Sequence, residues 1–348
     1  MAIISSVKDP RIAAVRELST ATARRAANKC VLEGELLIEQ AIEAGAALEF
    51  VLLAERALDR APDCPVHEVT PGVLKQALRS QKPVTALAVA ELGAQSGEFG
   101  ELALVAEDIA DPGNLGTIVR TACGLGATDI VLTEERADPT SRRALEASRA
   151  AVLRASLHRY PDPATALDSL HALGFEIAVT APAGRTVPAL TPLSGGPLAV
   201  VLGNETTGVS EAVLERADHV VRIPMATEVE SLNVGVATGV ALAALRERML
   251  AVSLPRRCAA AVFPEPVRAA LAARLGSLGH AAPAEFEALT AAGAGRETPL
   301  DETLRAKGWL DDRGLSTEGR AQLLALWPEY TAALRACPRG TDKPGNPT

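Results

Sequence analysis

Short apolar runs alternate with helical patterns through the middle of the chain. Five runs are typical of buried strands and lie at Leu102–Ala106, Asp129–Leu132, Glu176–Thr180, Leu198–Leu202 and Val220–Ile223. Helical segments separate most of them, and this alternation predicts a mainly parallel α/β sheet with helices on both faces. Because such sheets bind ligands at the carboxyl ends of their strands, we expect an α/β domain over residues 102–253 with its site at that edge.

The residues before this region show a second, smaller pattern. Helical segments near 11–18, 35–44 and 71–78 alternate with apolar runs at 30–34, 50–53 and 86–89. This predicts a small α/β domain over residues 1–92. Glycine and serine in residues 93–101 predict a linker to the larger domain.

The last hundred residues are Ala-rich and mostly helical in pattern. Residues 254–337 predict several helices and a hairpin around Asp312-Arg313-Gly314, followed by a helix capped by Ser316 or Thr317. This order is typical of a winged-helix fragment, which contacts nucleic acid or helps subunits associate. The acidic Asp311 and Asp312 favour subunit association. Residues 338–348 predict a disordered tail.

Composition narrows the class of protein. Hydrophobic residues make up 48% of the 348 residues and aromatic residues only 3%, so Ala, Val and Leu must build the core. No apolar run approaches the ~20 residues of a membrane span, and the N-terminus lacks a signal-peptide pattern, so we expect a cytoplasmic protein. The five cysteines are scattered without metal-ligand spacing, which predicts reduced thiols and no metal site.

Three polar segments follow predicted strands. Asp108–Thr133 contains a Pro112-Gly113-Asn114 turn before a helix that carries Arg120, and Leu198–Ser210 places Gly203-Asn204-Glu205 directly after a strand. The third, Val221–Arg248, crosses a polar loop into an apolar helix for which Ser231 is the expected N-cap. Ordinary strand ends and helix caps would also produce each segment taken alone.

Together the three segments resemble, in order and spacing, the three motifs of the SpoU/TrmH branch of the SPOUT RNA 2′-O-methyltransferases. The resemblance covers residues 1–250, including Leu32-Glu33-Gly34 in the predicted substrate-binding domain. It implies a trefoil-knotted catalytic domain, a homodimer and S-adenosylmethionine as the cofactor. It also implies an RNA substrate, with ribosomal RNA favoured over transfer RNA.

Loop chemistry agrees better with S-adenosylmethionine than with a dinucleotide. Gly203 to Gly208 supplies neither the third glycine of G-x-G-x-x-G nor the lysine of a phosphate-binding loop. An adenine can rest among apolar side chains and backbone amides while a few polar groups orient the amino-acid part. The residues that resemble the family's cofactor loop are Leu202, Gly203, Ile223, Met225, Ser231 and Leu232.

Methyl transfer to a ribose oxygen requires a hydroxyl that loses its proton and a group that stabilises the developing oxyanion. The resemblance gives Arg120 the activating role, but a guanidinium stays protonated in proteins. We therefore expect Arg120 to act by charge and position. Asn114 and Glu205 are expected to hold Arg120 and the ribose, and Asn233 resembles the asparagine of the third motif.

The formal charge of −8 is unusual for a protein that binds RNA, but basic residues cluster locally. Residues 1–29 hold six basic and two acidic residues, and six arginines lie between Arg136 and Arg159. Solvated helix faces would explain either cluster alone. We expect four of these arginines to contact RNA: Arg24, Arg25, Arg142 and Arg149.

Two departures from the family pattern affect the predicted RNA surface. Thr206 and Thr207 follow Glu205 where glycine or a basic residue is common, and residues 149–154 replace a small, glycine-containing turn. The resulting hypothesis is an S-adenosylmethionine-dependent RNA 2′-O-ribose methyltransferase. Its alternatives are a base-nitrogen methyltransferase of the same superfamily and a non-catalytic RNA-binding or regulatory protein that keeps the fold.

Overall fold

The computed structural model describes residues 3–54, 58–78, 80, 83–93, 99–133, 136–186, 193–226, 231–261, 263–278, 283–312 and 314–336. The predicted tail at 338–348 lies outside these residues, as do parts of the predicted linker and of the loop before Ser231. The chain divides into two compact units, Met1–Arg248 and Met249–Thr348. The long helix α9 (Val234–Ala260) runs from the first unit into the second.

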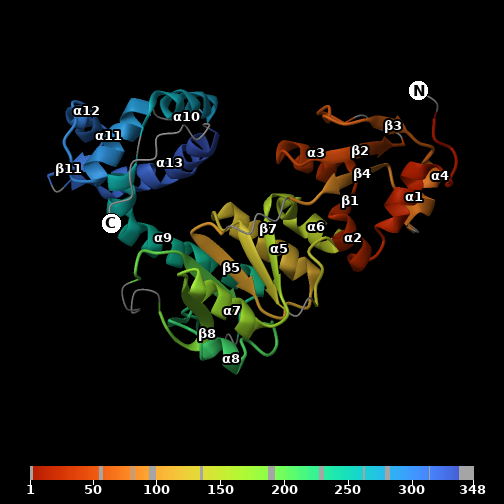
Figure 1. The fold of residues 1–348 in the computed structure, drawn as a ribbon, viewed down its shortest axis with the longest axis horizontal. Helices are drawn as coiled ribbons and strands as arrows, with labels where there is room; N and C mark the ends of the chain where they lie inside the picture. Colours follow the sequence, from red (N-terminus) through yellow and green to blue (C-terminus); the bar gives the residue numbers. More distant parts are fainter. Residues whose placement is uncertain are drawn as a thin grey trace. The chain divides into compact units, whose positions relative to one another are not determined.

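The first part of the larger unit is built on a four-stranded sheet (Figure 1). The strands are β1 (Lys29–Glu33), β2 (Leu48–Leu53), β3 (Val66–Glu68) and β4 (Ala86–Glu91), in the order β1-β4-β2-β3. The helices are α1 (Pro10–Glu17), α2 (Ala21–Ala27), α3 (Glu35–Glu43) and α4 (Pro71–Leu78). Helices α1 and α4 bury Ile12, Val15 and Leu74 against one sheet face, because their apolar residues recur at helical spacing.

The second part of this unit is a six-stranded sheet whose neighbouring strands are all parallel. The strands are β5 (Leu102–Ala106), β6 (Asp129–Thr133), β7 (Ser156–Tyr160), β8 (Glu176–Arg185), β9 (Leu198–Leu202) and β10 (His219–Val221). Their order is β10-β8-β9-β5-β6-β7. The predicted parallel α/β sheet is confirmed.

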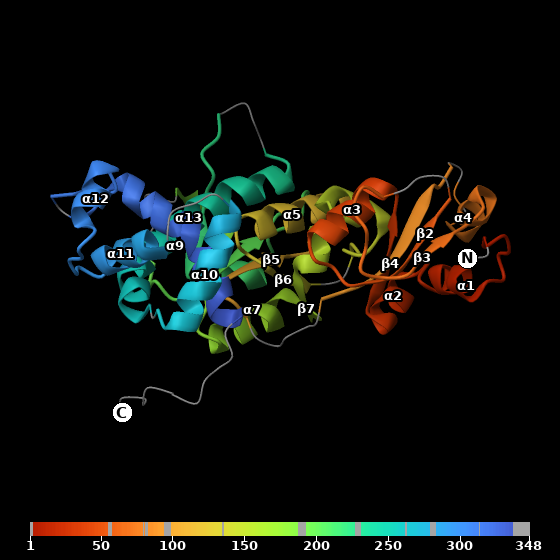
Figure 2. The same cartoon turned by 90° about the horizontal axis from the view of Figure 1, so that it is seen from above.

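Helices cover both faces of this sheet. They are α5 (Pro112–Gly124), α6 (Arg142–Ser148), the 3-10 turn η1 (Ala151–Arg154), α7 (Pro163–Ala172) and α8 (Glu211–Leu214). Figure 2 shows α5 and α7 on opposite sides of the strands. All residues of β5, β6 and β9 are buried, as expected for parallel strands covered on two faces.

Strand order places a topological switch point between β5 and β9. From β5 the chain moves outward through β6 and β7, whereas β9, β8 and β10 lie on the other side. The carboxyl ends of β5 and β9 lie side by side, with Ala106 paired to Leu202. A crevice where parallel strands diverge in this way is the usual ligand site of an open α/β sheet.

Four elements differ from the sequence predictions. The strand β7 was not predicted because it is an edge strand with only one fully buried residue, and β3 is short and half exposed. Helix α2 was not predicted, because it buries none of its residues and so shows no apolar stripe. Strand β10 begins earlier than predicted, at His219, because this histidine is buried against Glu176 at 2.7 Å.

The smaller unit is helical. It contains α10 (Glu265–Leu278), α11 (Pro283–Gly293), α12 (Asp301–Ala306), the hairpin β11 (Leu310–Asp311) with β12 (Gly314–Leu315), and α13 (Thr317–Ala336). Its core joins Phe286, Leu323 and Tyr330. The Ser316 hydroxyl accepts the Gly319 amide hydrogen at 3.0 Å, so the predicted cap of the last helix is confirmed.

Candidate active site

The loops that follow β5 and β9 hold each other at the switch point. The Asn204 side-chain amide donates to the Asp108 carbonyl oxygen at 2.8 Å, and the Asn204 Oδ1 accepts the Thr206 amide hydrogen at 2.8 Å. Asp108 has a left-handed backbone with φ of 52°, which asparagine and aspartate tolerate better than most residues. Asn204 and Asp108 were not predicted as site residues, although an asparagine two residues before Thr206 is a known turn signal.

Helix α5 begins at this edge with two strong start signals. Asp111 is the N-cap, with its Oδ1 accepting the Asn114 backbone hydrogen at 2.8 Å, and Pro112 occupies the first helical position. The other Asp111 oxygen forms an ion pair with Arg143 at 2.8 Å. Asp111 therefore fixes the backbone of Asn114, and it too was missed as a site residue.

One hydrogen-bonded cluster joins the three motifs. The Asn114 Nδ2 donates to the Glu205 Oε1 at 2.8 Å, and the Asn233 Nδ2 donates to the Asn114 Oδ1 at 3.0 Å. These three residues are separated by 91 and 119 positions along the chain. The carboxylate can only accept, so the amide of Asn114 is oriented by Glu205 and presents its oxygen to Asn233.

The third member of the cluster also begins α9. The Asn233 Oδ1 accepts the Gly235 amide hydrogen at 2.9 Å, so Asn233 is the cap of α9, whose first residue is Val234. The prediction that Ser231 caps this helix was wrong, because α9 begins too late for its hydroxyl to reach the first turn. Ser231 is exposed.

Arg120 lies on α5 but outside this cluster. It is six residues after Asn114, and six residues at 100° each place the two side chains about 120° apart around the helix axis. Arg120 is exposed, and Asn114 uses its amide on Glu205 and Asn233 instead. The expected contact that holds Arg120 through Asn114 and Glu205 is absent among the described residues of this chain.

The residues expected at the cofactor surround the same edge. Leu202 ends β9 and is 1% exposed. Gly203 is followed by a tight turn in which Asn204 and Gly208 form a bridge, and a Cβ on Gly203 would collide with the Gly208 backbone. Met225 and Leu232 expose 40% and 36% of their surface, while Ile223 is half-buried.

These residues fit an S-adenosylmethionine molecule in chemical character. Exposed apolar side chains at Met225 and Leu232 lose water when an adenine covers them, and Gly203 is half-buried. The described residues contain no group of three or more metal-binding side chains. No described helix is long and apolar enough to cross a membrane.

The four arginines expected to contact RNA occupy different environments. Arg24 is largely buried and donates to Asp138, to the Thr140 hydroxyl and to the Leu18 carbonyl oxygen, so its guanidinium is used within the protein. Arg142 is half exposed and pairs with Glu33 and Glu146, each at 2.9 Å. Arg25 and Arg149 are exposed.

Comparisons with known proteins identify the family of this chain. Residues 101–243 match the model of the SpoU rRNA Methylase family. A tRNA/rRNA methyltransferase of Synechocystis, itself uncharacterized, is 31% identical over 272 residues, which cover 73% of this chain and 97% of that protein. The 23S rRNA (guanosine(2553)-2′-O)-methyltransferase RlmP of Bacillus subtilis is 27% identical over 70% of this chain and 98% of its own length.

A solved structure gives the same result. The AdoMet-bound rRNA methyltransferase of Sinorhizobium meliloti superposes with a TM-score of 0.59 and 26% identity, covering 71% of this chain and 97% of that one. The matched share corresponds in size to the larger unit, which contains the Asn114, Glu205 and Asn233 cluster. This chain therefore belongs to the SpoU family of RNA methyltransferases.

Proposed function

We propose that this SpoU-family enzyme transfers the methyl group of S-adenosylmethionine to the 2′-hydroxyl of a ribose in ribosomal RNA. The observation that carries the proposal is the Asn114, Glu205 and Asn233 cluster at the switch point of the parallel sheet. RlmP, which methylates a ribose in 23S rRNA according to its name, supports ribosomal over transfer RNA. The cytoplasm is the expected compartment for this substrate.

Bound S-adenosylmethionine supplies a methyl group on a sulfonium, which a ribose oxygen can attack. Met225, Leu232 and the backbone at Leu202 and Gly203 would hold it, with Ile223 behind them. The Glu205 carboxylate accepts a hydrogen bond from the ribose hydroxyl, and the amide of Asn114 keeps that carboxylate in place. Asn233 in turn fixes Asn114 from the start of α9.

The charge needed at the developing oxyanion comes from a second copy of the chain. Arg120 is exposed and turned about 120° away from Asn114, so one chain alone does not aim it at its own cluster. Leu232, Val236 and Val240 lie four residues apart and expose 36%, 52% and 45% of their surface. An apolar stripe of this kind supports a homodimer in which Arg120 completes the partner's site.

The trefoil knot and the role of the first 92 residues belong to the same proposal. After β10 the chain returns to α5, where Gly235 packs against Thr117 and Gly239 lies near Thr121. This return from an edge strand toward the switch point supports the proposed knot. Residues 1–92 would bind the RNA, with Arg25, Arg142 and Arg149 offering exposed guanidinium groups.

Radiolabelled S-adenosylmethionine and total RNA that lacks the modification test the proposal. We expect label in ribosomal RNA, and digestion to nucleosides should place it on a ribose. Label on a base would identify a base methyltransferase instead. Cofactor binding without transfer to naked RNA or to ribosomal subunits would favour the non-catalytic alternative.

A further inference from the structure

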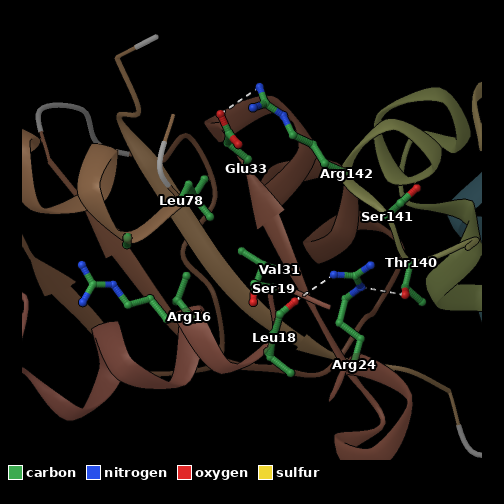
Figure 3. Close-up of a pocket in the computed structure, with 12 residues that line it drawn as sticks. Arg16, Leu18, Ser19, Arg24, Val31, Glu33, Leu78, Thr140, Ser141 and Arg142 are labelled. Atoms are coloured by element: carbon green, nitrogen blue, oxygen red, sulfur yellow. Dashed lines mark hydrogen bonds and ion pairs between the residues drawn. The ribbon is translucent and has the colours of Figure 1, made fainter. Parts of the chain in front are cut away.

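A cavity of about 610 Å³ lies between the first 92 residues and the start of α6 (Figure 3). Its apolar wall comes from α1, β1 and α4 and includes Leu18, Val31 and Leu78. Residues 140–142 form the opposite wall. The active-site cluster contributes no residue to this cavity, and the proposed mechanism leaves it without a role.

Two ion pairs connect the walls. In one pair the arginine belongs to the first 92 residues, and in the other it belongs to α6. Arg24 of α2 pairs with Asp138, and Arg142 of α6 pairs with Glu33 of β1 at 2.9 Å. The Arg24 and Asp138 side chains are only 13% and 19% exposed, so this pair is protected from water and salt. The two ion pairs tie the walls together on either side of the cavity.

Two polar groups in the lining remain available. The Glu33 side chain is 10% exposed and gives its Oε1 to Arg142, while its Oε2 is buried and has no hydrogen-bond partner in the described part of the chain. Burial raises the pKa of this carboxyl, although Arg142 opposes the shift. Arg16 is exposed and makes one long hydrogen bond, 3.5 Å to the Gln76 carbonyl oxygen. A ligand in the cavity could therefore donate a hydrogen bond to the Glu33 Oε2 and place an anionic group beside Arg16.

Helix α6 connects this cavity to the candidate active site. Arg142 faces Glu33 in the cavity, and its neighbour Arg143 pairs with Asp111 at 2.8 Å. Asp111 caps α5 and holds the backbone of Asn114 at 2.8 Å. A ligand that reaches the cavity is therefore placed in a fixed register relative to the methyl-transfer site.

We propose that the cavity holds one unpaired nucleotide of the RNA substrate, at a distance from the ribose that is methylated. The base lies against Leu18, Val31 and Leu78, one of its N–H groups reaches Glu33 after a small turn of that carboxyl, and a phosphate rests on Arg16. Each RNA base carries such an N–H group, and splayed single-stranded bases are the usual targets of sequence-reading proteins. A paired base cannot enter, because its N–H groups and faces are covered in the duplex. The inference rests on the proposed RNA substrate.

Fluorescence anisotropy with the full-length protein tests the cavity directly. The probes are a short labelled single-stranded oligoribonucleotide and the same strand in a duplex. Arg16→Gln removes the proposed phosphate contact, and Lys8→Gln removes an exposed positive charge that lies outside the lining. Ser19→Glu places a carboxylate at the lining, and Ser5→Glu makes the same charge change at an exposed site elsewhere.

We expect Arg16→Gln and Ser19→Glu each to weaken single-strand binding about tenfold, the size of one lost charge-assisted contact. Lys8→Gln and Ser5→Glu should change it less than about twofold, since distant exposed charges are screened. The duplex should bind more weakly than the single strand. Equal effects of the cavity variants and their controls, or tighter binding of the duplex, would overturn the proposal.

Methyl transfer measured on the same variants separates this proposal from the proposed function. Arg16→Gln and Ser19→Glu should raise KM for RNA while kcat and S-adenosylmethionine affinity stay at the wild-type level. If the wild-type protein never labels RNA, the proposed function is contradicted. The binding measurements with the single strand and the duplex still test the proposal for the cavity. If the wild-type enzyme is active and KM for RNA is unchanged in both Arg16→Gln and Ser19→Glu, only the proposal for the cavity is contradicted.

Discussion

Asn114 donates its side-chain amide to Glu205 over 2.8 Å, although 91 positions separate the two residues along the chain. The bond fixes both groups at once, because Glu205 sits on an exposed loop and Asn114 is held by the cap of α5. The same Asn114 amide accepts from Asn233 at 3.0 Å. Three segments that are far apart in the sequence are thereby locked into one arrangement.

Replacing Glu205 with glutamine should separate geometry from charge. The glutamine can still accept from Asn114, but its neutral amide is a poor acceptor for a hydroxyl proton. We expect kcat to fall about 100-fold, the lower range for loss of acid–base assistance, with unchanged cofactor affinity. Single-turnover methyl transfer and calorimetry measure the two quantities. Glu215→Gln changes an exposed carboxylate at the end of α8, outside the site loops, and should leave kcat unchanged; an equal loss there would contradict the assignment.

Mixing two inactive variants tests whether Arg120 acts on a partner chain. Arg120→Ala should lower kcat about 100-fold or more, as for loss of an oxyanion-stabilising group, while cofactor binding persists. An equimolar mixture with Glu205→Gln should regain about a quarter of wild-type activity, because half the dimers are mixed and each has one intact site. Activity that stays at the level of the separate variants would place Arg120 in the site of its own chain.

Two glycines on α9 differ in what surrounds them. A Cβ at Gly235 would lie 2.6 Å from the Thr117 Cγ2, whereas at Gly239 the nearest atom is Thr121 Cγ2 at 3.5 Å. Gly235→Ala should push α9 away from α5 and break the bond between Asn233 and Asn114, so that kcat falls. Gly239→Ala should keep activity and stabilise the helix by about 1 kcal/mol. Thr117→Ser removes the clashing methyl and should rescue Gly235→Ala; failure of this rescue would contradict the steric explanation.

The buried pair of Arg24 and Asp138 should appear in the acid stability of the larger unit. Burial alone would raise the pKa of Asp138, but hydrogen bonds from Thr140 and Arg24 outweigh it and leave the pKa below its usual value. A lowered folded-state pKa stabilises the protein above the unfolded value, near pH 4, and this stabilisation disappears as the pH falls through the folded value. Urea unfolding of wild type and Asp138→Asn should differ by about 2 kcal/mol at pH 7 and converge at acid pH. Parallel pH profiles would contradict the assignment.

Arg149 adopts a left-handed backbone that glycine accepts more easily. It is the C-cap of α6, with φ of 52° and ψ of 47°, and its side chain is exposed. Arg149→Gly should raise the free energy of unfolding by about 1 kcal/mol, since a side chain costs roughly that much in this conformation. Arg149→Ala keeps the Cβ and should give no gain. Denaturant melts of the two variants compare them directly, and equal stability would mean that the backbone is unstrained.

The strands and their order of appearance could be predicted from the sequence because burial leaves a local pattern. Continuous apolar runs at β5, β6 and β9 identify strands covered on both faces, and Asp111 with Pro112 is a local start signal for α5. Local patterns failed where an element is half exposed, as in α2 and β7. Local patterns also predicted the wrong N-cap for α9, Ser231 instead of Asn233, because the start of this helix depends on its packing against α5.

The sequence by itself determined the family and the parallel sheet and singled out Asn114, Glu205 and Asn233 as candidate site residues, because each of these signals comes from neighbours a few positions away. Only the tertiary structure decided how these residues are connected, that Arg24 forms an ion pair with Asp138 inside the protein, and that Arg120 lies apart from the cluster. The reason is physical: hydrogen bonds between side chains more than 90 positions apart depend on strand order and helix rotation. Strand order and helix rotation cannot be predicted from any single segment of the chain.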